Sequence, residues 1–65
     1  MQTAGEKIKA WREKKGLSQG ELAELSGLHI TTIGKIEVGM RPNPSINTLQ
    51  KIAAALGISV AKLLN

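Results

Sequence analysis

Apolar residues recur at helical spacing along most of the chain. Ala4, Ile8 and Trp11 stand at i, i+4 and i+7, and mainly charged residues fill the positions between them and up to Gly16. This spacing places apolar side chains on one face of a helix, and glycine favours the left-handed conformation in which many helices end. We therefore expect a first helix over residues 3–15.

Capping and turn residues predict the next two helices. Ser18 is followed three residues later by Glu21, which is the pattern of a capping box at a helix start. It predicts a second helix over residues 19–26, which Gly27 ends. A third helix is expected over residues 30–37.

The most regular amphipathic pattern lies near the end of the chain, where apolar residues fall at i, i+3, i+4 and i+7. These residues are Leu49, Ile52, Ala53 and Leu56. They predict a fourth helix over residues 46–56, capped by Ser45, and a short fifth helix follows over residues 60–64. Because no segment alternates with a period of two, we expect no sheet and an all-α fold of five helices.

Length and composition limit the class of protein. The chain has 65 residues, 42% of them hydrophobic, so we expect one globular domain over residues 1–65. It contains no cysteine, no apolar run near the roughly 20 residues that a bilayer span needs, and no export signal at its start. A cytoplasmic protein without a membrane segment is the expectation.

The charge balance favours a polyanionic partner. Nine Lys and Arg residues oppose five acids, which gives a net charge of +4. From Val38 onward the bases Arg41, Lys51 and Lys62 are accompanied by no acid. Charge alone identifies no partner, but nucleic acid fits this distribution.

Catalysis and metal binding are the poorest fit to the residue types present. The chain has no Asp, no Cys, no Tyr, one His and no glycine-rich phosphate loop. Neither a nucleophile with its base nor a metal-binding cluster can be assembled from such a set. We therefore expect a protein that is not an enzyme and holds no metal and no cofactor.

A helix-turn-helix is indicated by the spacing of small and apolar residues within the second and third expected helices. Ala23 is small where two helices would cross, and Gly27 suits a turn that needs positive φ. Ile33 and Ile36 follow at positions that would face the core.

The flanking segments carry a family resemblance. The sequence GEKIKAWREKKGLSQ at residues 5–19, ELA at 21–23 and TLQKIAAALGIS at 48–59 resemble the phage Cro and repressor family of bacterial regulators over almost the whole chain. The resemblance implies a domain whose third helix lies in the major groove of DNA while the second crosses the phosphate backbone.

On this resemblance, the residues that face base edges are Ile30, Thr31 and Lys35. Ile30 lies about 120° from Ile36 around the helix, so it does not easily share the core face, and a thymine methyl would give it a partner. The alternatives are a partly buried core edge for Ile30 and a solvated side chain for Lys35.

Phosphate contacts are expected from the start of the second helix, from the third helix and from the loop that follows it. The residues are Gln19, Thr32, Arg41 and Asn43. Gln19 opens a helix, where free N–H groups and the positive dipole end favour an anion. Mere helix capping by Gln19 and ordinary polarity of the loop residues are the alternatives.

The chain departs from the family at three positions and matches it in one ion pair. The family usually has Ser, Thr or Asp before the third helix, where this chain has His29, and Gly20 and Gly34 lie inside helices at a cost of about 1 kcal/mol each relative to Ala. Arg12 and Glu37 resemble a structural ion pair of the family.

Two functions are compatible with this fold. A homodimer formed through the C-terminal helices would place two reading helices roughly 34 Å apart, and its operator would be an inverted repeat that it binds as a repressor. The alternative is a protein-interaction module, such as an antitoxin or an antagonist, that uses the same fold. Enrichment of a palindrome from random DNA would favour the first.

Overall fold

Five helices and their connections account for the computed structural model, which describes residues 3–40 and 44–64. The helices are α1 (Ala4–Lys14), α2 (Gln19–Ser26), α3 (Ile30–Glu37), α4 (Ile46–Leu56) and α5 (Ala61–Leu64). The described residues contain no strand. The expected all-α fold is thereby confirmed, and the expected bounds of α2, α3 and α4 match the observed ones.

Side-chain caps set the first residue of each of the first two helices. The Ser18 hydroxyl accepts a hydrogen bond from the backbone N–H of Glu21, and the Glu21 carboxylate accepts one from the backbone N–H of Ser18. Thr3 and Glu6 form the same reciprocal pair at α1. Thr3 is thus the cap and not the first helical residue, so α1 begins one residue later than expected.

The other bounds differ from expectation by one residue. Lys15 is the C-terminal cap of α1, and α5 begins at Ala61 instead of residue 60. The turn between α2 and α3 is as predicted, because Gly27 has a φ of 74° in the left-handed region, which glycine adopts without steric cost.

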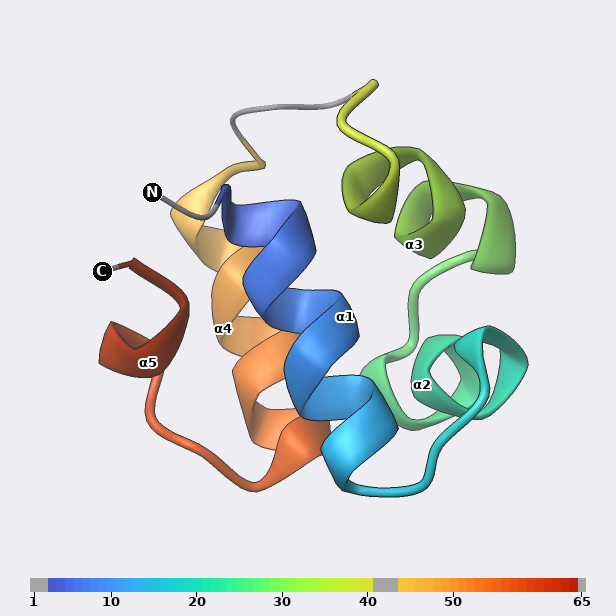
Figure 1. Ribbon diagram of the computed structural model, residues 1–65, viewed down its shortest axis with the longest axis horizontal. Helices are drawn as coiled ribbons and strands as arrows, with labels where there is room; N and C mark the ends of the chain where they lie inside the picture. The colour runs from blue at the N-terminus through green and yellow to red at the C-terminus, as the bar shows by residue number, and fades with distance from the viewer. Residues whose placement is uncertain (1–2, 41–43, 65) are drawn as a thin grey trace.

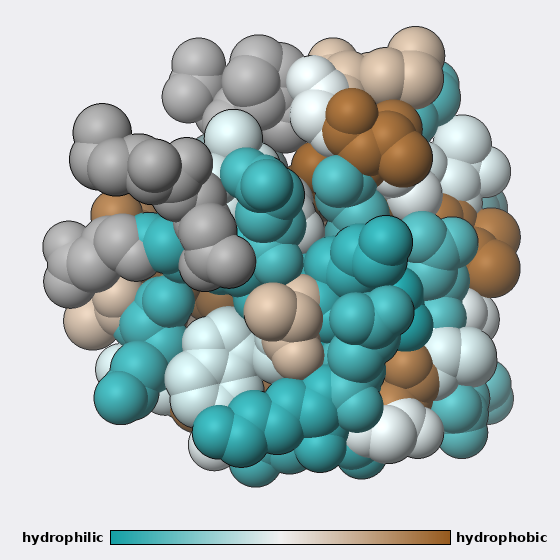
Figure 2. Space-filling view, in the orientation of Figure 1, coloured by the Kyte–Doolittle hydropathy of each residue, from teal (hydrophilic) through white to brown (hydrophobic). Residues whose placement is uncertain are grey.

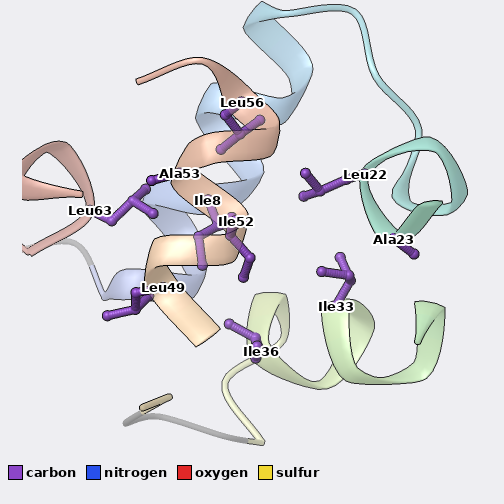
Figure 3. Close-up of a cluster of buried hydrophobic side chains, with 10 residues drawn as sticks. All are labelled: Ile8, Leu22, Ala23, Ile33, Ile36, Leu49, Ile52, Ala53, Leu56 and Leu63. Atoms are coloured by element: carbon purple, nitrogen blue, oxygen red, sulfur yellow. The ribbon is translucent and has the colours of Figure 1, made fainter. Parts of the chain in front are cut away.

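One hydrophobic core receives side chains from all five helices (Figure 3). Its largest fully buried members are Ile8, Leu22, Ile33, Ile36, Ile52 and Leu63. The four residues that predicted α4 are all buried as well. A short chain gains much of its stability in this way, because each helix contributes at least one apolar side chain to the same cluster.

The helices divide into two sides around a central pair (Figure 1). Helices α1 and α4 pack against each other, α2 packs on α3 and α4, and α5 packs on α1 and α4. Helix α5 therefore lies on the opposite side of the domain from α2 and α3 (Figure 1). This arrangement leaves one face of α3 without a neighbouring helix.

The crossing of α1 over α3 depends on a buried glycine. A Cβ built on Gly5 would overlap the carbonyl oxygen of Ile36 and lie 3.2 Å from the Cα of Glu37. The absence of a side chain at Gly5 thus lets the start of α1 approach the end of α3.

The surface that faces the viewer in Figure 2 is mostly hydrophilic, and separate hydrophobic patches lie mainly toward α2 and α3. Among the described residues, no helix combines the length and the apolar character that crossing a bilayer demands.

Candidate nucleic-acid interface

Helix α3 has one buried and one exposed face. Ile33 and Ile36 are buried in the core, whereas 52% of the Ile30 surface is accessible and Thr31 and Lys35 are exposed. Ile30 therefore stands off the core face, as its angular position predicts. The three residues expected to face base edges lie together on the exposed side of one helix.

The start of α2 joins this surface through two glycine positions. A Cβ built on Gly20 would lie 3.6 Å from the Cδ1 atom of Ile30, so the tip of Ile30 rests beside the first turn of α2. A Cβ built on Gly34 would lie 3.8 Å from the Oε1 atom of Gln19. The first turn of α2 and the exposed face of α3 thus form one continuous surface.

A buried ion pair lies behind this surface. The Nε and Nη2 atoms of Arg12 donate to the two carboxylate oxygens of Glu37 at 2.7 and 3.0 Å, and Nη1 donates to the carbonyl oxygen of Leu17 at 2.8 Å. Donation to the Glu37 carboxylate raises the pKa of Arg12 above its ordinary value. These are the two residues that the family resemblance paired.

Gln19 is bonded to the same carboxylate. Its Nε2 atom donates to Oε1 of Glu37 at 3.0 Å, and the side chain is half-buried. Sequence reasoning missed this bond because the two residues are 18 positions apart and belong to different helices. No short-range pattern marks such a contact, so only the packed fold shows that Glu37 holds both Arg12 and Gln19.

The outward face of α3 is positive or neutral, whereas the first turn of α2 carries the exposed carboxylate of Glu21. Lys35 is exposed, and the nearest carboxylate on α3, that of Glu37, is buried against Arg12. Ser18 satisfies the N–H of Glu21, the third residue of α2, and the first turn keeps the positive end of the helix dipole. An anion would meet no exposed carboxylate on the outward face of α3.

The remaining expected residues fall into two groups. Thr32 is half-buried beside the exposed face, and His29 is the N-terminal cap residue of α3 but makes no side-chain capping hydrogen bond, in keeping with its low capping preference. Arg41 and Asn43, the expected loop contacts, lie outside the described residues. No group of three His, Cys, Asp or Glu residues in the described part of the chain is placed to hold a metal ion.

Comparison with known proteins shows close sequence relatives. A family model described as "Helix-turn-helix" matches residues 8–63. The HTH-type transcriptional regulator SinR of Bacillus licheniformis is 44% identical over 61 residues, which cover 94% of this chain and 55% of SinR. Control protein C.SmaI of Serratia marcescens is 48% identical over 59 residues, which cover 91% of this chain and 69% of that protein. The chain therefore spans only about half the length of SinR.

Solved structures show the same fold. A crystal structure of SinR, the master regulator for biofilm formation, in complex with DNA has a TM-score of 0.92 and 42% identity, covering 95% of this chain and 98% of that one. A structure of the SinR protein/SinI protein complex has a TM-score of 0.89 and 43% identity, covering 94% of this chain and 59% of that one.

Proposed function

This chain belongs to the helix-turn-helix family, and from that premise we propose that it is a transcriptional regulator that binds double-stranded DNA. The binding surface is the exposed face of α3 together with the first turn of α2. The observation that carries the proposal is the division of α3, which buries Ile33 and Ile36 but exposes Ile30, Thr31 and Lys35. The DNA complex of SinR, whose domain has the same fold, supports it.

Each residue of the surface takes a role suited to its chemistry. Ile30 contacts a thymine methyl group, Thr31 bonds to a base edge, and Lys35 reaches the O6 and N7 acceptors of guanine. Gln19 and Thr32 lie at the edges of this face and contact phosphate oxygens. Arg41 and Asn43 supply a second phosphate contact from the loop after α3.

We further propose that the protein acts in the cytoplasm, at the nucleoid, as a dimeric repressor. Leu64 is 55% exposed and Val60 is half-buried at the C-terminal end of the fold, where a two-fold axis would bury both. Two reading helices related by that axis would contact half-sites one helical turn apart, so the operator is an inverted repeat.

Selection from a random-sequence duplex pool tests this proposal. Protein-bound DNA is separated by mobility shift and sequenced, and the expected result is an enriched inverted repeat. The affinity for the selected duplex is then measured at several salt concentrations, where it should fall by about 0.9 log units per neutralised phosphate for each tenfold rise in salt. A pool that yields no enriched sequence contradicts the proposal.

A second candidate function is protein binding. Leu17, Glu21, Glu24 and Leu25 line an open hollow of about 320 Å³ on the outside of the domain, and 62% of the Leu25 surface is accessible. The complex of SinR with SinI supports a protein partner for this fold. A module that bound only protein would retain no DNA in the selection, and its partner affinity would fall with Leu25→Ser but not with Lys35→Gln.

A further inference from the structure

The amide of Gln19 has a fixed orientation. Glu37 is paired with Arg12, and an ionised carboxylate only accepts hydrogen bonds. The Gln19 atom that lies 3.0 Å from Oε1 of Glu37 must therefore be the donor Nε2, which removes the usual ambiguity between the two ends of an amide. The carbonyl oxygen Oε1 consequently points away from Glu37.

That oxygen lies over the exposed face of α3. It is 3.8 Å from the position that a Cβ on Gly34 would occupy. Gly34 is about 40° from Ile30 around the helix, on the side toward Thr31, so it belongs to the face proposed to enter the major groove. The Gln19 oxygen therefore stands beside the reading residues, although it comes from the preceding helix.

The oxygen is also free to accept a hydrogen bond. No donor among residues 3–40 and 44–64 bonds to it, and no side-chain nitrogen or oxygen of those residues is both buried and without a partner. An Oε1 atom without a partner and sealed from solvent would be such a buried atom, so the Oε1 atom of the half-buried Gln19 is in contact with solvent. It is an oriented acceptor at the surface.

We propose that the Gln19 side chain is a specificity-determining residue that reads a base through Oε1, a role that rests on the proposed DNA binding. A phosphate offers only acceptors, so it is no partner for this oxygen, whereas adenine N6 and cytosine N4 present donors in the major groove. Guanine and thymine present oxygen acceptors there and would oppose it. Any phosphate contact at Gln19 then falls to its backbone N–H or to the second N–H of Nε2, and Glu37 acts as the positioning residue.

Sequence selection with Gln19→Met tests this role. Methionine keeps the length of the side chain but has no amide oxygen, and Gln50→Met on the exposed side of α4 makes the same change elsewhere. We expect the wild type and Gln50→Met to prefer adenine or cytosine at one position of each half-site by about fivefold, the size of one net hydrogen bond. Gln19→Met should lose that preference and keep the others.

Two other results would overturn the proposal. If Gln19→Met binds every sequence more weakly but keeps all base preferences, Gln19 serves the backbone and not a base. If the wild type itself enriches no sequence, the proposed DNA binding fails, and this outcome is distinct because no variant is needed to see it.

A second measurement compares two duplexes with the same protein, and its wild-type arm needs no variant. The preferred adenine or cytosine of the selected duplex is replaced by an analogue that lacks the exocyclic amino group. The wild type should bind this duplex about fivefold more weakly, and Gln19→Met should bind the two duplexes equally. An equal loss for both proteins would show that another residue reads the amino group.

Discussion

Arg12 in α1 and Glu37 at the end of α3 meet through two parallel hydrogen bonds although they stand 25 residues apart. Both side chains are almost completely buried, with 10% and 2% of their surfaces accessible. The pair connects the first helix to the helix proposed to read DNA. Glu37 also accepts from Gln19, so one carboxylate joins α1, α2 and α3.

Removing one partner of this ion pair should unfold much of the population. Arg12→Met leaves the Glu37 carboxylate buried without its cation, and the free energy of unfolding should fall by about 3–5 kcal/mol. Denaturant titration followed by circular dichroism measures this change. Glu13→Gln, at an exposed neighbouring position, is the control and should change stability by less than about 0.5 kcal/mol. Equal stability of Arg12→Met and Glu13→Gln would show that the pair contributes little.

Two glycine-to-alanine substitutions should change stability in opposite directions. Gly5→Ala forces a Cβ into the carbonyl oxygen of Ile36 and should destabilise the fold by about 1–3 kcal/mol or more. Gly34→Ala meets only the Gln19 oxygen at ordinary contact distance and should stabilise it by up to about 1 kcal/mol, because alanine favours helix. Thermal midpoints of the two variants check both signs, and a loss of stability in both would contradict the finding that a Cβ at Gly34 meets only an ordinary contact.

Two isoleucines of α3 should separate folding from binding. Ile33 is completely buried, so Ile33→Ala should cost about 2–5 kcal/mol of stability. Ile30 is 52% exposed, so Ile30→Ala should cost much less stability but weaken binding to the selected duplex. Denaturation measures the stability of each variant, and mobility shift measures its affinity for the duplex. Unchanged binding by a folded Ile30→Ala protein would remove Ile30 from the interface.

Stability should decline in acid through the two capping boxes. Backbone hydrogen bonds from Thr3 and Ser18 lower the pKa of Glu6 and Glu21 below the ordinary 4.5. A lowered folded-state pKa stabilises the fold above the unfolded pKa, and this contribution disappears as the pH falls through the folded one. Denaturation midpoints from about pH 6 to about pH 3 should fall less steeply in a Glu6→Gln, Glu21→Gln double variant. If the midpoints of the wild type and the double variant fall equally with pH, the two capping boxes are not the cause of the acid sensitivity.

Local signals were enough to predict most of the fold. The Ser18 and Glu21 capping box and the left-handed Gly27 define α2 through contacts within a few residues, which a sequence pattern can show. The apolar spacing of α4 likewise places Ile52 in the core. The exposed position of Ile30 followed from its angle around the helix alone.

Contacts between distant segments were beyond the reach of such patterns. The bond of Gln19 to Glu37 and the close approach of Gly5 to Ile36 arise only when helices pack, so no spacing in the sequence marks them. The Arg12 and Glu37 pair was expected only through the family resemblance. The DNA contacts themselves stay predictions.

The DNA affinity of two matched lysine variants, measured at several salt concentrations, tests the central claim most directly. Lys35 lies on the exposed face of α3, and Lys62 is exposed on α5 across the domain (Figure 1). Fluorescence anisotropy with the selected duplex should show that Lys35→Gln binds at least about fivefold more weakly than the wild type at every salt concentration. The affinity of Lys62→Gln should stay close to that of the wild type. Equal, small losses in the two variants would contradict the proposal that this face of α3 binds DNA.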